Sequence, residues 1–115
     1  LRDEPIGIHG DGGQTRDFVH VTDIVGALAY AGASADMAGT DNVGYGRSQS
    51  ILELAQEILR LTGSKSAIEQ LPPRAGDVRH SLASTERLLS AGWKPKSSVQ
   101  SGLAETVEYF RQLKA

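Results

Sequence analysis

The chain has 115 residues, of which 39% are hydrophobic and 23% charged, so we expect one folded domain over residues 1–115 with a core of its own. Its formal net charge of −2 gives no basic field for nucleic acids, and the lack of cysteine excludes disulfides, thiolate catalysis and cysteine-ligated zinc. Its apolar runs are too short to span a membrane and its N-terminus does not match a signal peptide, so we expect a cytoplasmic location without membrane contact.

The N-terminal part of the chain predicts short strands followed by a strongly apolar helix. Residues 6–9 alternate apolar with small or polar side chains and predict a strand that a glycine-rich turn ends. Residues 18–21 predict a second strand, after which Thr22 is expected to cap a helix over residues 23–33. Because this helix is apolar on nearly all sides, we expect a second copy of the chain or a layer of a larger protein to cover it.

The remaining elements complete an α/β pattern of short strands and about four helices. They are a strand over 42–44, a loop over 46–49, a helix from a Ser50–Glu53 capping box to Gly63, a strand over 67–71, a short helix over 85–91, and a last helix that starts near Ser98 with Gln100 completing its cap. The three histidines lie on different predicted elements without the spacing of metal ligands, so we expect no metal site.

Two arginines stand in turns where a guanidinium and backbone amides can converge on an anion. Arg16 follows the glycine-rich turn, and Arg74 follows two prolines with Asp77 three residues later. A guanidinium matches two phosphate oxygens, and a carboxylate accepts from a ribose hydroxyl. The alternative for each arginine is an exposed ion pair with a neighbouring aspartate, which has no ligand-binding role.

The order of the motifs resembles the NAD-dependent epimerase/dehydratase family, the extended short-chain dehydrogenases/reductases, and most of all UDP-sugar 4-epimerases. The shared motifs are Gly-Asp-Gly-x-Gln-x-Arg-Asp-Phe at 10–18, Val-x-Asp-Ile at 21–24, Pro-x-Arg-x-Gly-Asp at 72–77 and Gly-Trp-x-Pro at 92–95. The resemblance implies that Arg16 and Arg74 bind the diphosphate of a nucleotide sugar, that Asp77 binds a ribose hydroxyl, and that Phe18 lines the same pocket. It also implies the C-terminal, substrate-binding portion of a Rossmann-type fold.

The chain departs from this family in the motifs that carry chemistry. The family's catalytic Tyr-x-x-x-Lys is absent, because Ser34, Gln49 and Leu113 stand four residues after the three tyrosines. The dinucleotide fingerprint is also absent, since the Gly-x-Gly at 44–46 lacks its third glycine and comes late in the chain. We therefore expect no catalytic residue and no cofactor site in this chain, although the resemblance implies NAD in the family.

Two interpretations follow from these observations. The first is the nucleotide-sugar-binding part of an epimerase or dehydratase, in which case a chain that begins with Leu1 is expected to be a piece of a longer enzyme. The second is a non-catalytic module that folds as a homo-oligomer and covers its apolar helix with a second copy.

Overall fold

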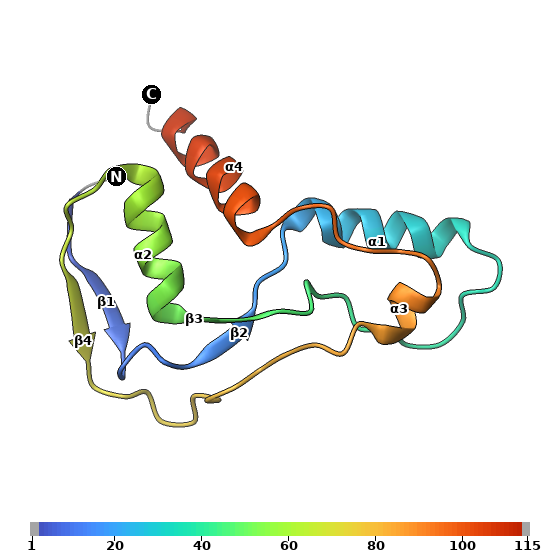
Figure 1. The fold of residues 1–115 in the computed structure, drawn as a ribbon, viewed down its shortest axis with the longest axis horizontal. Coiled ribbons are helices and arrows are strands. Elements are labelled where there is room, and N and C mark those ends of the chain that lie inside the picture. The colour runs from blue at the N-terminus through green and yellow to red at the C-terminus, as the bar shows by residue number, and fades with distance from the viewer. Residues whose placement is uncertain (1–2, 114–115) are drawn as a thin grey trace.

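The computed structural model describes residues 3–113 and contains short strands and helices in the expected order. The elements are β1 (Ile6–His9), β2 (Thr15–Asp17), α1 (Val21–Ala33), β3 (Ser48–Ser50), α2 (Ile51–Thr62), β4 (Ile68–Leu71), α3 (Glu86–Ser90) and α4 (Val99–Gln112). The molecule is flat, with extents of 49 × 37 × 17 Å. Figure 1 shows β1, β4 and α2 at one end and α1 and α3 at the other. Among residues 3–113, no helix is both long and apolar enough to cross a lipid bilayer.

The strand end of the molecule is a small parallel sheet covered by a helix. β1 pairs with β4 in the register Ile6↔Ile68 to His9↔Leu71, and α2 contacts β1 and α4. The buried apolar side chains here are Ile8, Ala55 and Val107. α2 presents its apolar residues at helical spacing, starts at the Ser50–Glu53 capping box and ends at Gly63 with a φ of 67°.

The opposite end of the molecule is held by a second apolar cluster and by one buried carboxylate. Ala27 of α1, Leu88 of α3 and Trp93 form this cluster. Asp23, only 4% exposed, accepts the amides of Lys96 and Ser97 at 2.8 and 3.0 Å. Burial alone would raise the pKa of Asp23, but these two amide bonds favour the charged form and lower the pKa overall.

Most of the predicted elements are confirmed, and the errors fall in the middle of the chain. The strand expected at 18–21 is wrong: β2 lies at 15–17, because it pairs with β3, and residue 21 already begins α1. His20 is the residue before that helix, and Thr22 does not cap it but bonds the His20 ring. β-branched residues near position 20 suggested a strand, but the position of the pairing partner decided the outcome.

Three further predictions were wrong. Residues 42–44 form no strand, and residues 48–50, expected partly in a loop, form β3. The side chain that completes the cap of α4 is that of Ser101, not Gln100, because Ser101 occupies the third helical position, where a side chain reaches back to the amide of Ser98.

One face of α1 is apolar and exposed. Val21, Val25 and Leu28 recur at helical spacing and are 65%, 59% and 66% exposed. The chain exposes 7801 Å² in total, whereas a folded monomer of 12.2 kDa exposes about 6,100 Å². The excess of about 1,700 Å² is larger than the area of about 800 Å² that one partner contributes to a standard protein interface.

Candidate functional site

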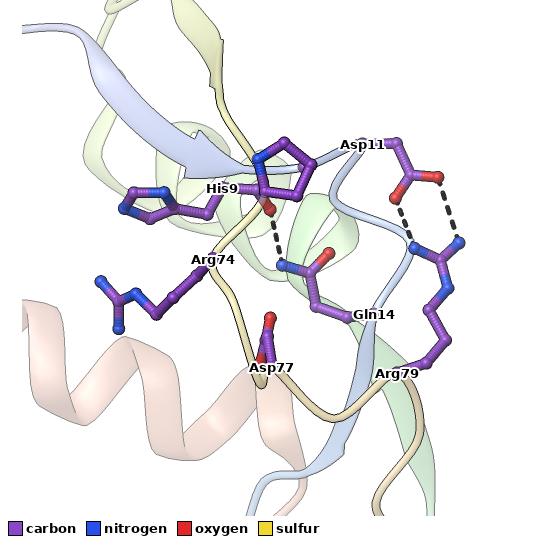
Figure 2. Close-up of a pocket in the computed structure, with 8 residues that line it drawn as sticks. His9, Asp11, Gln14, Arg74, Asp77 and Arg79 are labelled. Carbon is purple, nitrogen blue, oxygen red and sulfur yellow. Dashed lines mark hydrogen bonds and ion pairs between the residues drawn. The ribbon is translucent and has the colours of Figure 1, made fainter.

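The candidate site lies where three segments distant in the sequence meet beside β1. These segments are the end of β1 with its glycine turn, β2, and the loop over residues 72–80, which we call the 72–80 loop. A cavity of about 340 Å³ lies between the first and the last of these segments, and Figure 2 shows the side chains around it. The labelled residues that line it are His9, Asp11, Gln14, Arg74, Asp77 and Arg79.

The structure brings two of the predicted site residues, Arg16 and Asp77, into direct contact. Arg16 Nη2 donates to Asp77 Oδ1 at 2.5 Å, and the two side chains are 28% and 34% exposed. Nη1 of the same guanidinium donates to the carbonyl of Thr15 at 2.8 Å. The guanidinium is therefore oriented by its own strand and by the 72–80 loop together.

Arg74 and Asp77 line the same cavity, while Arg16 lines a different one, which it shares with residues such as Gly44 and Ser81. Asp77 is therefore linked to each arginine in a different way, to Arg16 by an ion pair and to Arg74 by the cavity that both residues line. Within residues 3–113, the Arg74 guanidinium makes no hydrogen bond or ion pair, and Figure 2 shows it extended beside His9. Its donors are consequently available to a ligand.

Phe18 lies apart from these residues. It lines a mostly apolar hollow of about 160 Å³ with side chains of α2 and α4, among them Leu54 and Leu103. The structure therefore does not bring Phe18 together with Arg74 and Asp77 in one cavity.

A second ion pair, between Asp11 and Arg79, was not predicted from the sequence. Arg79 Nη1 and Nη2 donate to the two carboxylate oxygens of Asp11 at 2.7 and 3.1 Å, and the amide of Gly13 donates to Asp11 Oδ1 at 2.9 Å. The Arg79 guanidinium, followed by this amide, lowers the pKa of Asp11 to about 2. Asp11 stands in the motif at 10–18 and Arg79 two residues after the motif at 72–77, but local spacing gives no sign that positions 68 residues apart meet.

Backbone bonds also join the end of the 72–80 loop to β2. The amide of Thr15 donates to the carbonyl of Arg79 at 2.9 Å, and the amide of Ser81 donates to the carbonyl of Thr15 at 3.1 Å. Thr15 Oγ1 lies 2.9 Å from His80 Nδ1. Gln14, 8% exposed, donates to the carbonyl of His9 at 2.8 Å and joins the turn to β1.

The glycines at 44 and 46 have a structural role that a sequence motif does not reveal. Asp17 accepts the amides of Tyr45 and Gly46 at 2.9 and 3.0 Å. A Cβ at Gly44 would lie 2.4 Å from Asp17 Oδ2 and 2.8 Å from the Cβ of Ala83. Because the amides are occupied and the space is filled, these residues do not fit the phosphate cradle of a dinucleotide.

Metal ligation finds no basis in the described part of the chain. Across residues 3–113, no group of three or more histidine, aspartate or glutamate side chains is placed to hold a metal ion. His80 instead contacts Thr15, and His20 contacts Thr22.

Comparison with known proteins gives consistent matches over nearly the whole chain. No protein-family model matches the chain. It is 42% identical over 105 residues to UDP-glucose 4-epimerase of Mycolicibacterium smegmatis, a match that covers 90% of this chain and 34% of that protein. It is 36% identical over 105 residues to GDP-L-fucose synthase of Sinorhizobium fredii, with 91% and 33% covered.

Solved structures give the same result. The UDP-glucose 4-epimerase of Thermotoga maritima, determined with UDP-glucose, has a TM-score of 0.91 and 36% identity over 99% of this chain and 37% of that one. The UDP-N-acetylglucosamine 4-epimerase of Methanobrevibacter ruminantium, determined with UDP-N-acetylmuramic acid, has a TM-score of 0.89 and 34% identity over 95% and 35%.

The fold is thus that of the Rossmann-type epimerases and dehydratases, matched over about a third of their length. The chain belongs to the NAD-dependent epimerase/dehydratase family, the extended short-chain dehydrogenases/reductases, and corresponds to the C-terminal third of its members. The expected fold class and family are therefore confirmed. The chain spans about a third of the length of the curated relatives that it matches.

Proposed function

We propose that this chain binds the nucleotide end of a nucleotide sugar, most favourably a UDP-sugar. Arg16 and Arg74 contact the diphosphate in this proposal, and Asp77 accepts a hydrogen bond from a ribose hydroxyl. The observation that carries the proposal is that Asp77 pairs with Arg16 and lines one cavity with Arg74. Structures of similar proteins with UDP-glucose and with UDP-glucuronic acid support the substrate class.

The charges of the site fit a doubly charged ligand. The free Arg74 guanidinium supplies donors at one side of the cavity, while Arg16 is already desolvated in part and oriented by two acceptors. Charge-assisted hydrogen bonds of this kind contribute about 1.5 to 3 kcal/mol each. Asp77 has a second carboxylate oxygen with which to accept a hydroxyl, so pairing with Arg16 and binding a ribose are compatible.

The proposed role is positioning and not chemistry. Structures of similar proteins have been solved with NAD, which takes and returns a hydride in this family. In this chain, however, the Gly-x-Gly at 44–46 does not fit a dinucleotide, and the sequence contains no Tyr-x-x-x-Lys pair. We therefore expect the 115-residue chain alone to convert no sugar nucleotide, and detectable epimerisation by the purified chain would contradict this proposal.

The direct test is calorimetric titration of the 115-residue chain with UDP. Arg16→Ala and Arg74→Ala are each expected to weaken binding at least tenfold, on the order expected for one charge-assisted hydrogen bond. Arg60→Ala is the matched control, because Arg60 is exposed on α2 and pairs only with Glu57 among the described residues. Unchanged UDP affinity in both site variants would show that the two arginines have only a structural role.

A second candidate function is a non-catalytic module that assembles as a homo-oligomer. The observation that favours it is the exposed apolar face of α1 formed by Val21, Val25 and Leu28. A second copy can cover this face, but so can additional protein of the kind that relatives about three times as long contain. Sedimentation of the 115-residue chain distinguishes the two arrangements, because an oligomer is expected if a second copy covers the face and a monomer if other protein covers it.

A further inference from the structure

The Asp11–Arg79 pair lies at the edge of the proposed site, outside the residues to which a ligand role was given. Its bidentate geometry joins the glycine turn after β1 to the end of the 72–80 loop. The 72–80 loop carries both Arg74 and Asp77, and every residue of it is exposed. Packing therefore does little to fix its conformation, and its position depends on its polar contacts.

Those contacts fall into two classes with respect to a ligand. The Arg16–Asp77 pair uses groups that the proposed ligand also contacts, so a bound diphosphate shares the Arg16 guanidinium with Asp77. The Asp11–Arg79 pair uses neither Arg16 nor Arg74, and the backbone bonds of Thr15 with Arg79 and Ser81 adjoin it directly. With the contacts of His80 to Thr15 and of His9 to the Pro72 carbonyl, it is consequently one of the side-chain contacts that still hold the loop when the ligand engages the first pair.

We propose that Asp11 and Arg79 are positioning residues, whose ion pair holds the 72–80 loop so that Arg74 and Asp77 face a nucleoside diphosphate. This inference rests on the proposed function for its ligand, but its structural part concerns the free protein. Both side chains are more than half exposed, at 62% and 57%, so the pair contributes little to global stability. The pair instead stabilises the local structure where the 72–80 loop meets β2.

Gly13 gives a way to break the pair without removing either charge. A Cβ at this position would lie 2.6 Å from Arg79 Nη2 and 3.2 Å from Asp11 Oδ1. The backbone of Gly13 is not in the left-handed region, unlike that of Gly10 and Gly12, so alanine fits the main chain. The flexible end of Arg79 is then displaced.

The first measurement is amide hydrogen exchange at Thr15, Asp77 and Ser81 in the free 115-residue chain. Asp11→Ala, Arg79→Ala and Gly13→Ala are each expected to speed exchange about two- to fivefold, on the scale of one exposed ion pair. The charge-reversed double variant Asp11→Arg with Arg79→Asp should restore slow exchange. Arg60→Ala is the control that leaves these amides unchanged, and melting temperatures check that each variant is folded.

The second measurement is UDP affinity, for which the positioning role and simple electrostatics predict opposite signs. Removing the negative charge of Asp11 near an anion should tighten binding if only the field matters. If the pair positions the loop, Asp11→Ala and Gly13→Ala both weaken binding about two- to fivefold, as Arg79→Ala does. A loss of affinity in Arg79→Ala with tighter or unchanged binding in Asp11→Ala would overturn the proposal and make Arg79 a direct ligand contact.

The two measurements separate this inference from the proposed function. Unchanged exchange in all three variants overturns the positioning role even if UDP binds. If the unmodified chain does not bind UDP, the proposed function fails, and the exchange rates still decide whether the Asp11–Arg79 pair holds the loop.

Discussion

At one end of the molecule, exposed charged side chains are held in fixed pairs, whereas at the other end exposed apolar side chains have no partner within residues 3–113. The 72–80 loop is exposed throughout, yet Asp77 and Arg79 contact Arg16 and Asp11. On α1, by contrast, residues such as Leu28 are two-thirds exposed. Water can bond an exposed polar group that lacks a protein partner at little cost in free energy, whereas exposed apolar area is removed from water only when protein of comparable area packs on it. Within residues 3–113, the site end therefore pairs these charged groups with each other, while the apolar face of α1 stays uncovered.

The largest expected effect comes from the carboxylate that joins α1 to the segment before α4. Asp23→Ala leaves the amides of Lys96 and Ser97 without their acceptor and is expected to lower the free energy of unfolding by about 3 kcal/mol. Chemical denaturation measures this, with Asp36→Ala, an exposed position beyond α1, as control. A loss below about 1 kcal/mol would show that water replaces Asp23 readily.

The same carboxylate sets an acid limit for the α1 end. Its pKa is lower in the folded protein than its ordinary value of 3.8, so its contribution is complete above that pH and is lost as the pH falls through the folded pKa. Stability measured between pH 5 and pH 2 should therefore fall more steeply in the unmodified chain than in Asp23→Asn. Parallel curves would contradict the assignment.

How much of the fold and of the candidate site could be predicted depended on how far apart in the sequence the interacting residues lie. The capping box at Ser50 and the glycine that ends α2 use contacts within one helical turn, and both were predicted from the sequence. β3 reads Ser-Gln-Ser and has no apolar periodicity, so only its partner β2, more than 30 residues earlier, makes it a strand. That Arg16 and Asp77, 61 residues apart, serve one site was expected only through the family resemblance, and their direct contact was not predicted.

The roles of the aspartates were the least predictable part of the site. Asp17 was a candidate partner for Arg16, but its carboxylate accepts the amides of Tyr45 and Gly46 and fixes the segment after α1. Carboxylates in a motif can bind a ligand or tie down backbone, and the sequence does not distinguish the two, because the partner amides lie far along the chain.

The next largest effect concerns the exposed face of α1. The experiment tests whether a second copy of the chain covers this face. If it does, the 115-residue chain sediments as an oligomer at high concentration and Leu28→Lys converts it to a monomer, since an unpaired charge on this face is costly to bury. Leu82→Lys is the matched control, because Leu82 is 56% exposed and lies outside α1. A monomer in the unmodified chain would favour cover by a different protein segment.

The smallest expected effect lies at the site end and tests how firmly its exposed charges are paired. Asp11 should titrate with a pKa of about 2, so its modest contribution is present above 3.8 and disappears as the pH falls through 2. Carbon-13 NMR of the Asp11 carboxyl measures this directly. Arg79→Ala should raise the pKa towards 3.8, and so should Gly13→Ala, which keeps both charges but separates them. If Gly13→Ala leaves the pKa near 2, the Arg79 guanidinium still reaches Asp11 in another conformation. The site end is then less rigidly ordered than its ion pairs suggest.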